Sequence, residues 1–119
     1  MLFRSGMTAL VDAQGNIVIP HIECAMTLWA RTIGLIGCTS LASESGYWIE
    51  PCRGVHTWGM RFVLDVVYLG ADGTVLRLFK RVPPWRLCPL LLEAHAVLEL
   101  PAGSIAHYRI CEGDHYFLR

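Results

Sequence analysis

The sequence predicts a mainly β fold, arranged as a single-domain antiparallel β-sandwich or small barrel. Short runs of β-branched and aromatic residues recur along the chain, turns rich in Gly and Pro separate them, and one stretch alone has helical character. The length of 119 residues leaves room for one domain, which we expect to span residues 1–119.

The composition fits a well-packed protein and argues against a nucleic-acid partner. Hydrophobic residues make up 54% of the chain and charged residues 17%, so disorder is excluded. Ten basic and ten acidic side chains give a formal net charge of zero, whereas nucleic-acid-binding domains normally carry a basic excess. Because copies of a near-neutral protein do not repel each other, self-association into a homo-oligomer is permitted.

The cellular compartment is predicted from three features that the sequence lacks. Despite a mean hydropathy of +0.42, no run of 18 apolar residues occurs, so no membrane span is expected. The first residues lack the apolar centre and small-residue cleavage site of a signal peptide. The five cysteines are spread out and never form C-x-x-C, which argues against a disulfide framework or a zinc ribbon. We therefore expect a cytoplasmic protein.

The first predicted elements are a hairpin and a helix. Thr8–Val11 and Ile17–Ile19 are β-rich runs, and Asp12–Asn16 between them has the composition of a hairpin connection. One short helix is expected near residues 26–35, with Thr27 as its N-cap.

The strongest strand prediction lies at the middle of the chain. A short strand is expected at Tyr47–Ile49, and Phe62–Leu69 is apolar at nearly every position, as in a strand covered on both faces. Gly70–Gly73 turns the chain, and Thr74–Phe79 returns as an antiparallel partner. Pro83 and Pro84 then stop this strand, because proline cannot donate to a ladder.

Two more strands complete the prediction. Ala94–Leu100 ends at Pro101 and Gly103, and His115–Leu118 is the last strand. The total is seven or eight short strands.

The stretch Arg53–Phe79 carries three polar residues in an apolar strand-turn-strand pattern: His56, Thr57 and Asp65. Asp65 shares a strand face with two valines, where an unpaired carboxylate would be costly. In a structural interpretation the carboxylate binds backbone amides or Thr57 and fixes how two segments meet. In a functional interpretation it orients the imidazole of His56.

Three segments resemble a known family: WARTIGLIG at Trp29–Gly37, the stretch Arg53–Phe79, and AVLELPAGSIAHYRICEGD at Ala96–Asp114. This ordered pattern, from about Met7 to the C-terminus, is similar to the family called domain of unknown function 192. Relatives usually carry proline after the phenylalanine of the central motif, where this chain has Val63. The resemblance implies a compact, mostly antiparallel β domain similar to a jelly-roll sandwich, and it implies no established activity.

Our first functional hypothesis is a small non-catalytic binding module. Its cleft would recognise a small polar or anionic ligand, or a protein segment. Hydrogen bonds, apolar walls and an orienting charge would come from His56, Thr57, Trp58, Met60 and Asp65. Arg31 and Arg53 would contact an anion.

Two alternatives stay open. A small hydrolase would use His56 as general base oriented by Asp65, with Thr57 or Cys52 as nucleophile, although no known catalytic signature surrounds them. The other alternative is a purely structural subunit. Cys52 and His56 are four positions apart but belong to no recognised ligand cluster, so no metal and no cofactor is expected.

A basic cluster follows the central motif. Four basic residues occur within ten positions, with no acidic residue among them: Arg77, Lys80, Arg81 and Arg86. Phe79 and Trp85 are interleaved with these cations. The cluster is typical of a solvated edge strand that resists further pairing, and it also fits contact with an anion or a peptide carboxylate.

Overall fold

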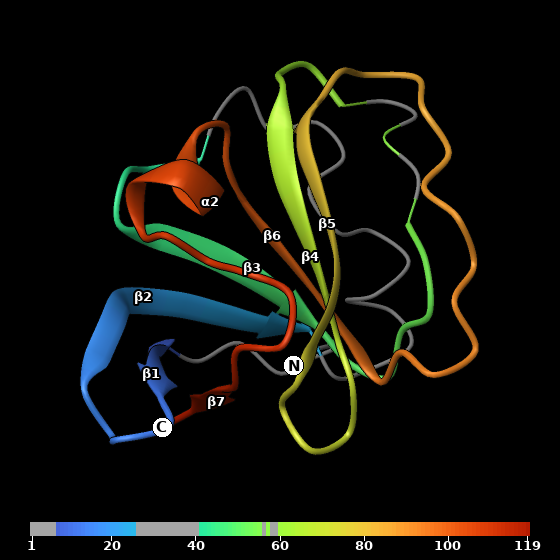
Figure 1. The fold of residues 1–119 in the computed structure, drawn as a ribbon. Helices are drawn as coiled ribbons and strands as arrows, with labels where there is room; N and C mark the ends of the chain where they lie inside the picture. Colours follow the sequence, from blue (N-terminus) through green and yellow to red (C-terminus); the bar gives the residue numbers. More distant parts are fainter. Residues whose placement is uncertain (1–6, 26–40, 56, 58–59) are drawn as a thin grey trace.

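The computed structural model describes residues 7–25, 41–55, 57 and 60–119 (Figure 1). In these ranges the chain forms seven strands and one short helix. Their bounds are β1 Met7–Asp12, β2 Ile17–Ala25, β3 Ser45–Ile49, β4 Leu64–Leu69, β5 Val75–Val82, β6 Ala96–Pro101, α2 Ser104–His107 and β7 Tyr116–Leu118.

The described strands form one mixed sheet in the order β5-β4-β6-β3-β2-β1-β7. Neighbouring strands are antiparallel except β2 and β3, which run parallel, with His21 opposite Ser45 and Cys24 opposite Trp48. The mainly β prediction is therefore confirmed, but its wholly antiparallel pairing is wrong at this point. A parallel pair requires a crossover connection, and residues 26–44 are long enough to provide one.

The sheet curls so that its two end strands meet at one point. Thr74 and His115 form an isolated antiparallel bridge, and the amide of Val75 donates to the carbonyl of Asp114 at 2.8 Å. Beyond this point β5 has β4 as its single strand neighbour among the described residues. Among the described residues, most of β5 is thus an open edge. The sandwich or barrel arrangement stays a prediction.

Apolar residues fill both faces of the sheet at its centre. All six residues of β4 are buried, which confirms the prediction of a strand covered on both faces. Along β6, Leu98 and Leu100 pack into one core with Ile105 of α2. Val97 belongs to the other core, to which Met60 and Phe62 before β4 and Cys88 and Leu91 before β6 contribute. The central strands therefore form a rigid platform.

Several predicted bounds shift in the structure. The strand predicted from Phe62 begins at Leu64, and the strand predicted to end at Phe79 continues to Val82. The helix predicted near residues 26–35 lies outside the described residues. α2 was not predicted, because four residues are too few to show helical periodicity.

The carboxyl group of Glu99 lies in the core. Glu99 on β6 is 3% exposed, and it sits beside Tyr47 of β3 and Val66 of β4 in the sheet register. Burial raises the pKa of Glu99 to about 7, because the charged form loses its hydration. The protein therefore holds this group largely as the neutral acid below neutral pH.

We predict that the free energy of unfolding falls as the pH rises from about 4.5 to about 7. In this range the folded protein holds a proton on Glu99 that the unfolded chain has released, so each rise in pH within the range favours unfolding. The fall should be on the order of 3 kcal/mol and should level off above pH 7. Urea unfolding at a series of pH values measures it.

The variant Glu99→Gln isolates this contribution, because it keeps the shape of the side chain and removes its titration. The difference in stability between parent and variant should change over the same pH range. A difference that stays constant with pH would contradict the assignment.

Candidate functional site

Thr57 is fully buried and joins two loops. Its hydroxyl donates to the carbonyl of Pro83 at 2.7 Å and accepts from the amide of Arg86 at 2.8 Å. Its own amide donates to the carbonyl of Arg86 at 2.8 Å. Thr57 therefore fixes residues 83–86 against the connection that precedes β4.

Asp65 is 1% exposed, and its carboxylate binds backbone amides. Oδ1 accepts from the amide of Arg81 at 2.9 Å. Oδ2 accepts from the amides of Gly103 at 3.1 Å and Ile105 at 2.9 Å. The structural interpretation of this residue, in which it binds amides and joins segments, is confirmed. These three bonds compensate its burial.

The Asp65 carboxylate faces an irregularity in β5. Leu64 pairs with Val82 and Val66 with Phe79, so Lys80 and Arg81 together lie opposite the single residue Asp65. Such a β-bulge leaves an extra amide outside the ladder, and here the carboxylate accepts from it. Arg81 has a φ of 52°, in the left-handed region, which the bond to Asp65 helps to hold.

Of the other predicted site residues, the described structure places Met60 and Arg53, and the predicted cleft stays a prediction. Met60 is buried in the core, and its amide donates to the carbonyl of Thr57 at 3.1 Å. Arg53 is exposed, and its carbonyl accepts from the amide of Leu91 at 2.8 Å. His56, Trp58 and Arg31 lie outside the described residues.

Asp65 and Thr57 position one wall of a groove. Asp65 holds the chain at Arg81 and Thr57 holds it at Pro83 and Arg86. Residues 78–83 and 86–89 line an open groove of about 390 Å³ beside the edge of β5. The two polar residues of the central motif therefore shape this groove indirectly, by holding the backbone that lines it.

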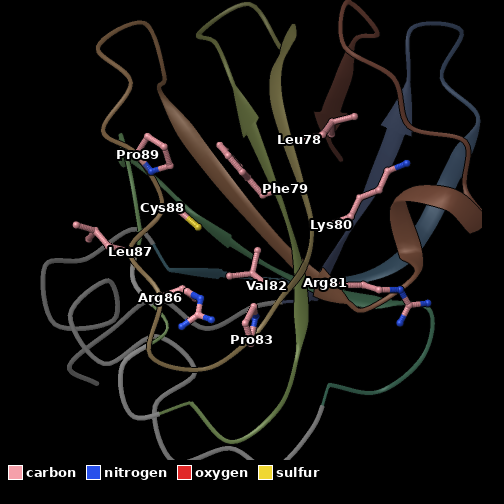
Figure 2. A pocket seen from close by; sticks show the side chains of 10 residues that line it. All are labelled: Leu78, Phe79, Lys80, Arg81, Val82, Pro83, Arg86, Leu87, Cys88 and Pro89. Atoms are coloured by element: carbon pink, nitrogen blue, oxygen red, sulfur yellow. The ribbon is translucent and has the colours of Figure 1, made fainter.

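The groove has an apolar and a basic part. Figure 2 shows the side chains of Phe79 and Val82 on the side of β5 that faces Cys88. Lys80 and Arg81 point to the opposite side of the strand, and Arg86 lies close to Val82 and Pro83. A ligand in the groove would thus meet apolar groups along the strand and one guanidinium on the facing loop.

The loop 83–94, which connects β5 to β6, exposes four large apolar residues. They are Trp85 at 67%, Leu87 at 74%, Leu90 at 72% and Leu92 at 68% exposure. A cluster of apolar side chains on a surface marks an interaction site more often than scattered ones do.

Hydrogen bonds anchor the backbone of this loop. The amide of Cys88 donates to the carbonyl of Val55 at 2.8 Å, and the phenol of Tyr68 donates to the carbonyl of Pro89 at 2.6 Å. Burial raises the pKa of the Tyr68 phenol, which therefore stays a donor. The apolar side chains project from a fixed scaffold.

The cations beside the groove are available to an anion. Within the described ranges, Lys80, Arg81 and Arg86 form no ion pair. The guanidinium of Arg77 lies 5.2 Å from the centre of the Phe79 ring. A negatively charged ligand would therefore not have to displace an internal carboxylate.

The described residues lack two further features. They contain no group of three or more His, Cys, Asp or Glu side chains placed to hold a metal ion. No helix in this part of the chain is long and apolar enough to cross a membrane.

The groove is predictable from the sequence only in part. The basic cluster was recognised, but the exposed leucines were not, because Leu87–Leu92 has neither strand nor helix periodicity. A usable signal was available: prolines at 83, 84 and 89 exclude a regular strand there, so an apolar run among them lies in a loop.

Comparisons with known proteins place the whole chain in one family and one fold. The model of the DUF192 family, described as an uncharacterized ACR, matches residues 9–117. None of the curated proteins matches the chain.

Two solved structures share the fold. A protein of unknown function from Novosphingobium aromaticivorans superimposes with a TM-score of 0.79 at 22% identity, covering 97% of this chain and 86% of its own. A proposed transcription regulator from Sinorhizobium meliloti gives a TM-score of 0.77 at 20% identity, with coverages of 99% and 96%. At these identities the likeness shows the fold alone.

We predict that Asp65→Asn lowers the free energy of unfolding by roughly 1–3 kcal/mol, because an amide cannot accept all three backbone bonds. Chemical denaturation measures the change. Glu112→Gln, at an exposed carboxyl, is the matched control and should leave stability unchanged. Equal stability of Asp65→Asn and the parent would contradict the role given to the carboxylate.

We predict that Thr57→Val loosens residues 83–86, whereas Thr57→Ser does not. Valine keeps the shape but removes the hydroxyl that binds Pro83 and Arg86, and serine keeps the hydroxyl. Amide hydrogen exchange at Arg86 should be faster in the valine variant alone. Exchange at Arg86 that is as slow in the valine variant as in the parent would contradict this role of the hydroxyl, and fast exchange in the serine variant alone would assign the role to the methyl group.

Proposed function

Because the chain belongs to the DUF192 family, which brings no assigned activity, we propose its function from its own surface: a non-catalytic module that binds an extended segment of a partner protein along the open edge of β5. The observation that carries this proposal is the groove beside that edge, next to a loop that exposes four large apolar side chains.

The edge of β5 offers backbone hydrogen bonds. Its strand neighbour in the described sheet is β4, and beyond the contact of Val75 with Asp114 no second strand lies against it. An added strand would satisfy the outward amides and carbonyls, while side-chain pockets would select the sequence. The groove is bounded by the strand and by residues 86–89, which suits an extended segment.

The side chains suggest the chemistry of the partner. Residues 76–92 contain four basic side chains and no acidic one. Arginine pairs well with carboxylates, and Arg86 lies at the groove itself. Trp85, Leu87, Leu90 and Leu92 would bury apolar side chains of the partner. The proposed ligand is thus an extended segment that combines acidic and apolar residues.

The basic residues could instead protect the edge strand from pairing with another copy, but this role explains fewer features of the surface than a binding role does. Lysine and arginine on an edge strand discourage pairing between copies, and bulges have the same effect. Neither device explains an anchored loop with exposed Trp85 and leucines, because exposed apolar groups promote association. The apolar loop therefore favours a binding surface over a merely protected edge.

Peptides selected from a random library on the immobilised protein provide the probe. Amide chemical shifts in labelled protein should change along 78–89 when a selected peptide is added. We predict that Arg86→Ala and Leu87→Ser each weaken its binding about tenfold or more, measured by calorimetry. The matched controls are Arg119→Ala and Ile17→Ser, an exposed cation that follows β7 and an exposed apolar residue of β2.

N-methylation of alternate peptide residues tests the added strand. Alternate amides of an added strand face β5. Methylation of one alternating set of peptide amides should therefore abolish binding, and methylation of the other set should leave binding intact. Equal effects of methylation on both sets would contradict strand addition. Shift changes away from the groove, self-association in sedimentation, or binding to lipid vesicles in place of peptide would overturn the proposed partner.

A further inference from the structure

A second cavity, of about 250 Å³, shares no lining residue with the groove beside β5. It lies where the end of β3, the turn between β4 and β5, and the last strand β7 come together. Its polar lining residues are Glu50 and His95, and its aromatic lining residues are Trp48, Tyr116 and Phe117.

Two donors hold the carboxylate of Glu50 in this cavity. Oε1 accepts from the indole Nε1 of Trp48 at 2.8 Å, and Oε2 lies 3.2 Å from Nε2 of His95. The side chain of Glu50 remains 27% exposed, so a ligand can reach it. The orientation of the charge is therefore fixed before any ligand arrives, which lowers the entropic cost of binding.

Small residues of the turn between β4 and β5 form one side of the cavity. Its lining residues there are Gly70, Ala71 and Gly73. A Cβ at Gly73 would lie 2.6 Å from the carbonyl oxygen of Tyr116 and 2.7 Å from the ring of Phe117. The Phe117 ring thus packs closely on a glycine backbone, and Gly73 also has a φ of 85° that favours glycine.

The charge balance of the lining selects a cation. Glu50 is the acidic group, and neither lysine nor arginine lines the cavity. Carboxylates and aromatic rings together recognise ammonium groups that carry apolar substituents, whereas a strongly hydrated metal ion would prefer several oxygen ligands.

We propose that this cavity binds an alkylammonium group, such as a methylated amine, with Glu50 as the counter-charge and Trp48, Tyr116 and Phe117 as its apolar walls. The site is independent of the peptide groove, because the two cavities have no residue in common.

Choline and its uncharged isostere 3,3-dimethylbutan-1-ol form the test pair, because they share a shape and differ in charge. Choline chloride should give saturable shift changes at the indole Nε1–H of Trp48 and at the amide of Phe117. Sodium chloride at equal ionic strength should give none. The isostere should bind at least about tenfold more weakly, because it lacks the charge that Glu50 would meet.

Three variants complete the experiment. Glu50→Gln keeps an acceptor for Trp48 and should weaken choline binding at least about tenfold. Ala71→Leu should block the cavity, and Glu112→Gln, an exposed acid elsewhere, should have no effect. Thermal melting checks that each variant is folded, and the comparison of choline with its isostere tests the proposal in the parent protein alone.

Three results would overturn this proposal. The first is the absence of choline-dependent shifts at Trp48 and Phe117, or shifts along 78–89 in their place. The second is equal binding of choline and its uncharged isostere. The third is unchanged choline binding in folded Glu50→Gln.

Discussion

The carboxylate of Asp65 accepts hydrogen bonds from three backbone amides, and this interaction joins three parts of the chain. It connects β4 to the bulge of β5 at Arg81 and to the start of α2 at Gly103 and Ile105. Each of these amides lies where regular pairing is interrupted, so each would otherwise lack a partner in the interior. The position of β5, and hence of the groove beside it, depends on one buried charge.

Thr57 and Tyr68 extend the same arrangement to the loop 83–94. Their hydroxyls bind carbonyls of Pro83 and Pro89, so the core determines the loop conformation. Such a loop can present Trp85 and Leu87 without collapsing them onto the core. The exposed apolar surface is therefore a property of the anchored backbone, which is the preorganisation that a binding surface needs.

Much of the fold could be predicted from the sequence, and much of the site could not. Alternation, turn residues and the apolar run of β4 gave the strands, because these signals are local. The parallel pairing of β2 with β3 depends on where the chain re-enters the sheet, which no local pattern encodes. The burial of Asp65 was predictable, but its partners are backbone amides, which every residue except proline supplies, so no residue type identified them.

The bulge in β5 also sets a length limit. At one end, Val75 is already bonded to Asp114, and at the other, Lys80 and Arg81 break the regular spacing of the strand. Between these points a second register shift lies at Leu76, so only Arg77–Phe79 keep the regular spacing that a docking strand could pair with. A strand that docks here cannot extend the pairing indefinitely, so the same irregularity that shapes the edge works against fibril growth from it.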